Sequence, residues 1–449
     1  MAGTFIKHAK PLLALTLPIM GTQLAQTGMG VVDTIIAGLA STLDLASIAV
    51  GSSIWVPLVM LVSGIMVALS PLVAQAKGAK DKAQSARILQ QGIYLSLLIG
   101  LMAMVLLLFL TTPLMQIMGV TQDIQVTTGE YLTYIAYGLP AVAVHQALRS
   151  YSEAINLTRP VTVIAVFGLL LNIPLNLLFV FGYGPIEAMG GPGCGLASCI
   201  IFYLLAILLG LYTLFSRYHQ SVKPLKNFGK PHGKTQLTIL ALGLPIGLAI
   251  FVEVSLFCII ALFIARLGPN VVAAHQITLN ISSLLFMVPL SLALALTVRV
   301  GQELGRGNVA RARLTWITGL KINLMFSLLN ACVLWFLGHS IVSLYSDDTN
   351  VVNLASFLLL YAALFQLSDG LQVAAAGALR GYKDTLVTLV ITITSFWLLA
   401  LPLGYYLGLS GNSPLGAEGF WIGLVVGLSI NALLLLTRLK KVSANSLAS

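Results

Sequence analysis

The chain has 449 residues, of which 58% are apolar and only 8% are charged. Because a soluble globular domain carries about 25% charged residues, this composition excludes a soluble protein that covers itself with polar side chains. The formal net charge of +10 could suit a nucleic acid. The positive residues stand in short loops between long apolar stretches, however, so we expect a lipid bilayer and no nucleic acid as the partner.

Twelve stretches of the sequence are long and apolar enough to cross a membrane as helices, which takes about 20 residues each. In chain order they lie near residues 11–38, 46–76, 88–112, 130–154, 161–181, 193–216, 236–265, 272–298, 312–338, 351–378, 385–409 and 416–437. The sequence therefore predicts an all-α integral membrane protein with twelve transmembrane helices.

The loops between these stretches differ in charge. Placing the N-terminus in the cytoplasm puts the Lys and Arg residues in inner loops and tails, except Arg266 at an outer turn and Lys321 inside the ninth stretch. An excess of positive charge marks the cytoplasmic side of a membrane protein. We therefore expect an even number of spans, both termini in the cytoplasm and a multi-pass location in the inner (plasma) membrane of a bacterium.

A long basic loop between the sixth and seventh stretches divides the chain near its middle. We expect an N-terminal lobe at 1–216, a basic cytoplasmic linker at 217–235, and a C-terminal lobe with a short cytoplasmic tail at 236–449. Each lobe would then hold six helices.

Short sequence matches relate the two lobes. One constant spacing superimposes Leu17, Pro18, Val73, Gln75 and Gly78 on Leu244, Pro245, Val300, Gln302 and Gly305. A slightly different spacing superimposes Leu148-Arg149 on Leu379-Arg380. Two six-helix repeats of the same orientation predict a pseudo-twofold axis along the membrane normal, a plan that secondary transporters use.

Three carboxyl groups lie well inside apolar stretches: Asp33 in the first, Glu253 in the seventh and Asp369 in the tenth. An ionised carboxylate at the bilayer centre costs about 2.5 to 3.5 kcal/mol on insertion scales, so such residues normally face a cavity, a partner or a transported ion. Burial alone favours the neutral acid and suits proton exchange, whereas a cluster of oxygen ligands suits a metal cation. The structural alternative is a neutral acid that is hydrogen-bonded to the backbone.

The fifth stretch offers companions for Asp33. Asn172 and Asn176 are four residues apart and therefore share one face of a helix. Two amide oxygens and a carboxylate suit a hard cation such as Na⁺, and Pro174 between them frees backbone carbonyls. The alternative is that these asparagines only form hydrogen bonds between helices. Gln26 lies on the polar face of the first stretch, which leads to Asp33.

The second half carries a different set of polar residues, Glu253, His275, Gln276, Gln366 and Asp369. The sequence has no nucleotide-binding loop, no zinc-protease motif and no soluble domain that could hold an ATPase. We therefore expect no enzymatic activity and no cofactor, and uphill transport would draw on an ion gradient.

Three runs of residues, Gln26 to Thr34, Val272 to Gln276 and Ala378 to Asp384, occur in this order along the chain. Together with the twelve stretches, the basic mid-chain loop and the two asparagines, they resemble the MATE family of multidrug and toxic compound extrusion transporters, in particular its NorM-type branch. The resemblance covers essentially the whole chain. It implies a V-shaped pair of lobes that exports amphipathic or cationic drugs by alternating access, in exchange for inward-moving Na⁺ or protons. We expect a monomer.

The resemblance also implies roles for individual residues of the N-terminal lobe. Asp33 matches the family's carboxylate on the first helix, and Asn172 and Asn176 match its companions on the fifth, where Na⁺ would bind. Ser198 stands where some members have a threonine beside that site, and it keeps a hydroxyl ligand there.

In the C-terminal lobe, Glu253 and Asp369 match the family's acidic pair. Some sodium-coupled members have a tyrosine four residues before this aspartate, where the present chain has Phe365. A hydroxyl is therefore missing from the second cation site. The expected substrate cavity has polar, aromatic and methionine walls that can repack around different drugs, and its candidate residues are Gln26, Met29, His275, Gln276, Phe286 and Phe365.

Three other functions stay open. A lipid-linked precursor flippase would carry more positive charge in its cavity to meet phosphate. A multispan membrane enzyme would carry catalytic residues clustered at one membrane face, and a channel would not need two repeated lobes. The intramembrane acids favour cationic cargo.

Overall fold

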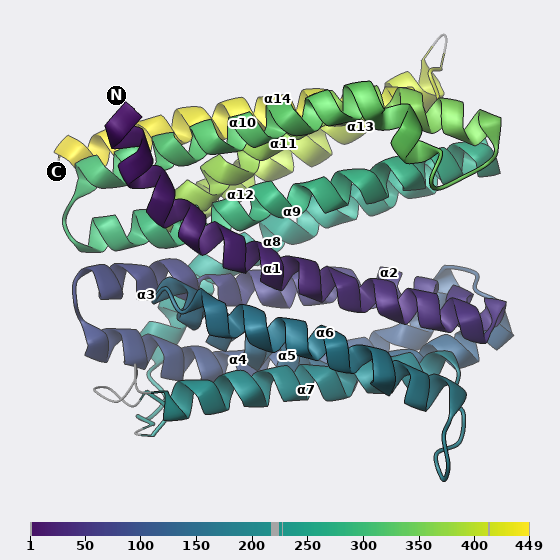
Figure 1. Cartoon of the computed structure of the whole chain (residues 1–449), viewed down its shortest axis with the longest axis horizontal. Coiled ribbons are helices and arrows are strands. Elements are labelled where there is room, and N and C mark those ends of the chain that lie inside the picture. The colour runs from purple at the N-terminus through teal and green to yellow at the C-terminus, as the bar shows by residue number, and fades with distance from the viewer. Residues whose placement is uncertain (1, 217–223, 227, 412–413, 449) are drawn as a thin grey trace. The chain divides into compact units, whose positions relative to one another are not determined.

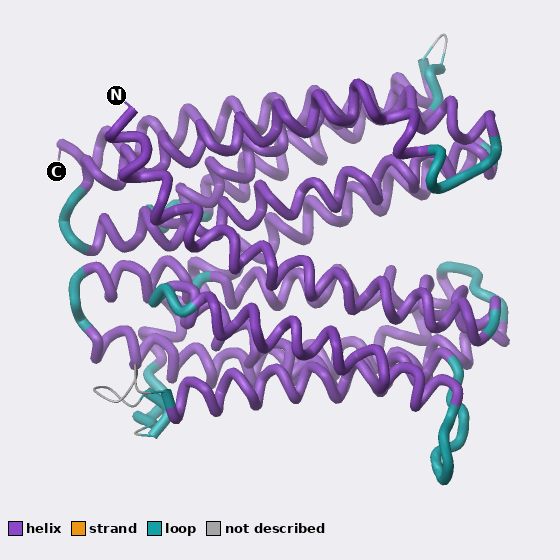
Figure 2. The backbone as a smooth tube through the Cα atoms, in the orientation of Figure 1, coloured by secondary structure: helices purple, strands orange, loops and turns teal. Residues whose placement is uncertain are grey.

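The computed structural model describes residues 2–216, 224–226, 228–411 and 414–448 (Figures 1 and 2). Within these ranges the chain is helical almost throughout, and it holds no strand beyond an isolated β-bridge between Tyr183 and Ile186. Twelve helical segments correspond to the twelve predicted stretches, which confirms the all-α fold class. Arg217 and Lys223 of the predicted linker lie outside the described residues.

The first six segments contain seven labelled helices. These are α1 (Ala2–Ala40), α2 (Thr42–Val67), α3 (Leu69–Gly78), α4 (Lys82–Ile117), α5 (Gln122–Ala154), α6 (Thr158–Phe181) and α7 (Gly191–Phe215). Helices α2 and α3 form one span that is interrupted at Ala68, whose N–H bonds to the carbonyl of Ile65 in a tighter turn. Pro71 explains this interruption, because a proline cannot donate to the carbonyl four residues before it.

The last six segments are built in the same way. They comprise α8 (Gly233–Ile264) with the short 3₁₀ turn η2 (Ala265–Leu267), α9 (Pro269–Gly305), α10 (Val309–Val342), α11 (Thr349–Gly381), the composite span of α12 (Leu386–Ile393), η3 (Thr394–Ala400), α13 (Leu401–Tyr405) and η4 (Tyr406–Ser410), and α14 (Ala417–Ala448). The wide π turns η3 and η4 flank Pro402, whose ring disturbs the hydrogen bonding of the preceding turn.

Ten of the described helices are long and apolar enough to cross a membrane by composition alone, so the chain is a multi-pass membrane protein. Helices α1 and α5 fall short of that standard because they carry more polar residues, among them Gln23, Gln26 and Arg149. Arg149 donates hydrogen bonds to the side-chain oxygens of both glutamines, so these polar groups satisfy each other between the two helices.

The chain divides into two compact units. One comprises Pro18–Gly247, and the other comprises Met1–Leu17 with Leu248–Ser449. Both divisions fall inside helices, close to the repeat-matched Pro18 of α1 and Pro245 of α8. The lobe boundaries expected at the basic linker stay a prediction.

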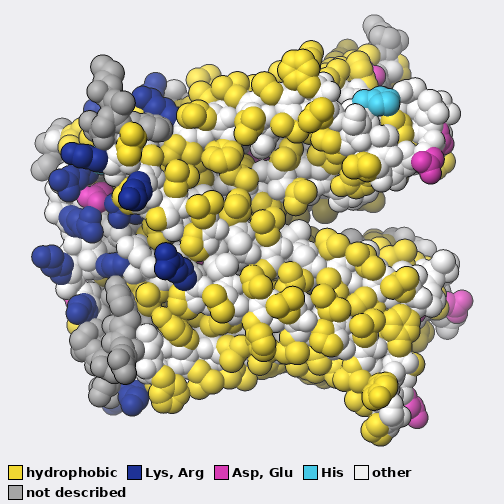
Figure 3. Space-filling model, in the orientation of Figure 1, with side chains coloured by type: hydrophobic (Ala, Val, Ile, Leu, Met, Phe, Trp, Pro, Cys, Tyr) yellow, Lys and Arg dark blue, Asp and Glu magenta, His cyan; other side chains and the backbone are white. Residues whose placement is uncertain are grey.

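Each unit has its own apolar core. In the Pro18–Gly247 unit, Leu132, Ile135 and Leu139 of α5 are fully buried among side chains of α2, α4 and α7. In the other unit, α9 and α11 approach so closely that a Cβ at Gly377 would meet the carbonyl oxygen of Ala293. On the face drawn in Figure 3, the Lys and Arg side chains of each unit gather at one end of its helices, as expected for a cytoplasmic side.

Candidate functional site

Asp33 lies on α1 between α6 and α7, with only 8% of its surface exposed. The side-chain nitrogens of Asn172 and Asn176 donate to its Oδ1 at 3.1 and 2.8 Å. The hydroxyl of Ser198 on α7 donates to its Oδ2 at 2.7 Å. The structure thus brings together all four residues that the sequence placed at the first site.

The helices explain why these side chains converge. Asn172 and Asn176 lie one turn apart on α6 and are both fully buried, so they present their amides on the same face. Asn176 is also held by a 2.9 Å bond from its Nδ2 to the backbone carbonyl of Asn172. The site is therefore built on rigid helical elements and does not depend on loops.

The acceptor atoms of this site are not all used. The side-chain oxygens of Asn172 and Asn176 are buried and have no hydrogen-bond partner among the described residues, although a buried polar atom normally has one. Rotation of each amide about its terminal bond would exchange nitrogen and oxygen and turn the free oxygen toward Asp33. Asn172 and Asn176 can therefore present either N–H donors to the Asp33 carboxylate or oxygen ligands to a cation, which the oxygens of Asp33 and Ser198 would also bind.

A second acidic cluster lies in the other unit, where Asp369 is buried and Glu253 is half-buried. Gln372 of α11 donates through Nε2 to Oε1 of Glu253 at 3.3 Å and to Oδ1 of Asp369 at 3.1 Å. Asn431 of α14 donates in turn to the Gln372 side-chain oxygen at 3.0 Å. One amide thus bridges the two acids that the sequence singled out, and the cluster joins α8, α11 and α14.

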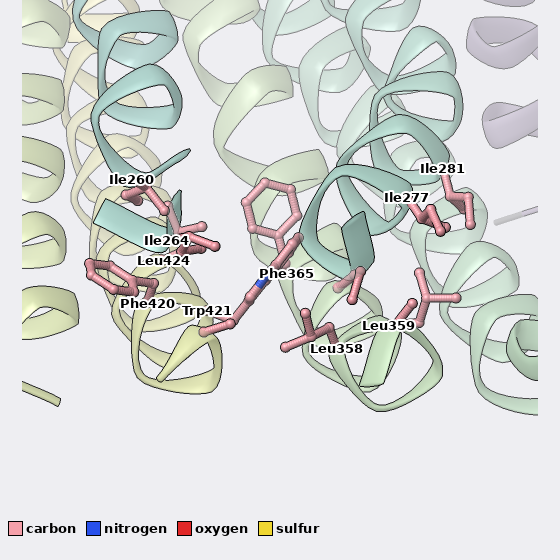
Figure 4. Close-up of a cluster of buried hydrophobic side chains, with 14 of the residues drawn as sticks. Ile260, Ile264, Ile277, Ile281, Leu358, Leu359, Phe365, Phe420, Trp421 and Leu424 are labelled. Atoms are coloured by element: carbon pink, nitrogen blue, oxygen red, sulfur yellow. The ribbon is translucent and has the colours of Figure 1, made fainter. Parts of the chain in front are cut away.

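Phe365 lies outside that polar cluster. It is 5% exposed and belongs to a buried apolar cluster with Ile260, Leu424 and Trp421 (Figure 4). Its ring meets that of Trp421 edge to face, with 5.9 Å between ring centres. A phenylalanine fits this apolar setting, since a buried tyrosine hydroxyl would require a hydrogen-bond partner.

His275 of α9 borders the same aromatic group. The indole N–H of Trp421 donates to its Nδ1 at 3.2 Å, while its Nε2 is buried and finds no partner in the part of the chain that the structure describes. The neighbouring Gln276 is exposed and Phe286 is half-buried. The three candidate cavity residues of α9 therefore differ strongly in environment.

The remaining residues that the sequence singled out lie in different environments. Met29 is buried beside Ile201 and Leu205. Gln26 is half-buried and accepts a 2.7 Å bond from Arg149. Gln366 donates to the backbone carbonyl of Ser282 at 3.1 Å, and Lys321 is exposed along α10.

Sequence reasoning did not foresee the burial of two arginines. Arg149 and Arg380 were expected in inner loops, but they lie in α5 and α11 and are only 3% and 8% exposed. Arg149 tolerates burial because Glu153, one turn away, pairs with it at 2.7 Å. The i,i+4 spacing of opposite charges was a usable signal for this pair.

Sequence reasoning also missed Gln372 and Asn431. Gln372 follows Asp369 by three residues and so shares its helix face, which is a detectable signal. Nothing in the sequence connects Asn431 with that face.

Chemically, the Asp33 site offers a carboxylate, two amides and a hydroxyl between α1, α6 and α7. Three donors stabilise the ionised carboxylate, whereas burial favours the protonated acid. These opposing effects suit a group that exchanges a proton or a small hard cation, and the oxygen atoms are of the kind that Na⁺ prefers.

Comparisons with known proteins agree with the sequence resemblance. The pattern that defines the MatE family matches residues 18–178 and 245–406, one match in each half. The chain is 43% identical over 430 residues to the probable multidrug resistance protein NorM of Acinetobacter baylyi, covering 96% of this chain and 95% of that protein. It is 40% identical over 438 residues to the multidrug resistance protein MdtK of Yersinia pseudotuberculosis, covering 97% and 96%.

Solved structures show the same fold. The crystal structure of the eukaryotic MATE transporter AtDTX14 matches with a TM-score of 0.89 and 23% identity, covering 99% of each chain. An outward-facing multidrug resistance MATE family transporter of the MOP superfamily matches with a TM-score of 0.87 and 21% identity, covering 97% of this chain and 96% of that one.

Proposed function

The chain belongs to the MatE family, and from this premise we propose that it is a secondary active multidrug exporter. It moves amphipathic or cationic drugs out of the cell by alternating access, in exchange for inward-moving Na⁺ or protons. The relatives of 40% identity or more are named as multidrug resistance proteins, which supports this cargo. We further propose a monomer in the bacterial plasma membrane with both termini in the cytoplasm, and neither a catalytic step nor a cofactor.

The observation that carries the proposal is the buried Asp33 with its three donors. A carboxyl group held inside membrane helices is expensive unless it serves an ion or a substrate. The paired asparagines can reverse their amides to receive Na⁺, whereas a proton can bind Asp33 without that change. Both ions therefore remain candidates for coupling at one site, and both reduce its negative charge.

Ion binding at Asp33 would compete with a cationic drug and favour one conformation. An ion that bound both conformations equally would shift no equilibrium. The distinguishing contacts would come from α1, because its residues Gln23, Gln26 and Asp33 connect it to α5, α6 and α7. Neutralising Asp33 would loosen one of these connections and let α1 bend near Pro18.

The direct test is efflux of a cationic dye from proteoliposomes under an inward Na⁺ or proton gradient, applied separately. Wild-type protein should expel the dye, and Asp33→Asn should lose nearly all ion-driven efflux while its monodisperse yield is unchanged. Asp123→Asn is the matched control, since Asp123 is an exposed acid in the first turn of α5. Undiminished efflux by Asp33→Asn would remove this site from the mechanism. Movement of a lipid-linked precursor without dye efflux would favour the flippase.

A further inference from the structure

Arg149 and Arg380 occupy matched positions in the two sequence repeats, but their surroundings differ. The guanidinium of Arg149 donates to the side-chain oxygens of Glu153, Gln26 and Gln23 at 2.7, 2.7 and 2.6 Å. All three of its nitrogens therefore have a partner, as a buried guanidinium requires.

Arg380 lacks such partners. Within the described ranges its one hydrogen bond runs from Nε to the carbonyl oxygen of Ala376, at 3.4 Å. Asp384, the counterpart of Glu153, is already paired with Arg438 of α14, whose Nε lies 2.6 Å from Oδ2. The guanidinium of Arg380 is thus buried with most of its hydrogen-bonding capacity unused.

Comparison of the two sequence repeats identifies one residue that could partner Arg380. With the spacing that relates α1 to α8, Ile250 occupies the position of Gln23, and Glu253 occupies the position of Gln26. Isoleucine cannot accept a hydrogen bond, whereas a glutamate accepts one and carries the opposite charge. In the first unit Arg149 contacts the neutral amide of Gln26 on α1. At the matched position of α8, the second unit has the acid Glu253.

The Arg380 side chain points in the right direction for this contact. Long side chains on a helix lean toward its N-terminus, and the bond to Ala376 shows that lean along α11. Two turns before Arg380 lies Gln372, whose amide holds Glu253 and Asp369. Arg380 and Glu253 attract each other electrostatically, but they do not form an ion pair in this conformation.

We propose that Arg380 is the resident counter-charge of the Glu253 and Asp369 cluster. It pairs with Glu253 when the cluster holds no cation, and it gives way when a cation binds. The buried Asp369 and the half-buried Glu253 share this region with one buried guanidinium, and an ionised carboxylate without a positive partner is costly inside a membrane helix. A monovalent cation therefore has to compete with Arg380 for Glu253.

The place of Arg380 in a transport cycle rests on the ion-coupled export proposed above. When Arg380 balances the charge of Glu253, the cation-free site can change conformation without a bound ion. Arg380 acts through Glu253 and is therefore a positioning residue. It would set how tightly the second cluster holds a cation, and so how readily that cation is released.

A stability cycle provides the first test and uses no transport assay. Arg380→Gln should lower the melting temperature of the purified full chain by several degrees, because it leaves Glu253 without its counter-charge. Adding Glu253→Gln should recover most of the lost melting temperature, since the second unit then has a neutral amide at this position, as the first unit does. Glu253→Gln should not rescue Arg149→Gln, which serves as the matched control. Failure of Glu253→Gln to rescue Arg380→Gln would overturn the pairing.

A cation titration provides the second test. In an Asp33→Asn background, which removes the first site, the melting temperature is followed against NaCl with choline chloride keeping ionic strength constant. Arg380→Gln should lower the Na⁺ concentration at half-maximal stabilisation about tenfold, a typical coupling between competing sites, and Arg380→Lys should stay near the parent. Adding Glu253→Gln should abolish the response. An unchanged or weaker Na⁺ response in Arg380→Gln would refute the competition, and neither result depends on drug efflux.

Discussion

The hydroxyl of Ser198 donates a 2.7 Å hydrogen bond to Oδ2 of Asp33, while the amides of Asn172 and Asn176 both converge on Oδ1. Within the described part of the chain, Ser198 is the one side chain that serves Oδ2. Hydrogen bonds to a charged group contribute about 1.5 to 3 kcal/mol, so this contact is large enough to affect ion binding measurably.

Ser198→Ala should therefore weaken Na⁺ binding at Asp33 and strengthen proton binding there. Under a Na⁺ gradient, loss of a hydroxyl ligand should raise the Na⁺ concentration for half-maximal efflux about tenfold. Under a proton gradient, loss of a donor makes the ionised form less favourable, so the midpoint of efflux should move about one unit to higher pH. Dye efflux from proteoliposomes measures both. Ser198→Thr keeps the hydroxyl and should behave like the wild type, and two unchanged curves for Ser198→Ala would exclude this role.

The asparagine pair allows a sharper separation of Na⁺ from protons. Both amide oxygens are buried and accept no hydrogen bond from any described residue, and only a metal cation needs them as ligands. The double variant Asn172→Ala/Asn176→Ala should lose Na⁺-driven efflux, with a Na⁺ affinity reduced more than about a hundredfold for two ligands. Proton-driven efflux should persist at a reduced rate. Equal loss under both gradients would show that the pair supports the fold of the site and does not select the ion.

The asparagine pair of the first site could be read from the sequence because its spacing is local, whereas Asp33 and Ser198 were placed beside it through the family resemblance. Asn172 and Asn176 fall one helical turn apart, so their shared face follows from helix geometry alone. Which end of each amide faces Asp33 depends on the hydrogen-bond network across three helices, and no sequence pattern determines that.

The second cluster was harder to predict for the same reason. Glu253 and Asp369 stood out as acids in apolar stretches, but the amide that bridges them belongs to Gln372, and Asn431 reaches it from α14. Asparagine and glutamine are common enough in membrane helices that neither stands out. Arg149 was assigned to a loop by its charge, although burial next to Glu153 satisfies it within the helix.

The Arg149 and Glu153 pair should matter more for stability than for ion selectivity. Both side chains are buried, and removing one partner of such a pair typically costs about 3 to 5 kcal/mol. Arg149→Leu should lower the melting temperature in detergent strongly, and Arg149→Leu/Glu153→Leu should recover part of it, because no uncompensated charge remains. The recovery should be incomplete, since Gln23 and Gln26 lose their donor as well.

Arg87→Leu is the matched control for this cycle, because Arg87 is an exposed arginine of α4 and exposed charges contribute little to stability. A melting temperature for Arg149→Leu that equals that of Arg87→Leu would mean that the buried pair contributes nothing measurable.

Gln91 of α4 holds the described part of the basic linker against the helix. Its Nε2 donates to the carbonyl of Lys230 at 3.1 Å, and its Oε1 accepts from the backbone N–H of His232 at 2.7 Å and from Gln236 at 3.2 Å. Gln91 itself is 1% exposed. One buried side chain thus makes two hydrogen bonds to the linker and a third to Gln236 in the first turn of α8.

Gln91→Ala should release the linker, because three partners lose their bonds at once and a protease needs locally unfolded chain. Limited trypsin digestion in detergent, with cleavage sites assigned by mass spectrometry, should show several-fold faster cutting after the exposed Lys226 and Lys234. Gln84→Ala, at an exposed position of the same helix, should leave the rate unchanged. If Gln91→Ala is cut no faster than Gln84→Ala, these hydrogen bonds do not restrain the linker, and its position must depend on contacts such as the bond from Gln90 to the carbonyl of Pro224.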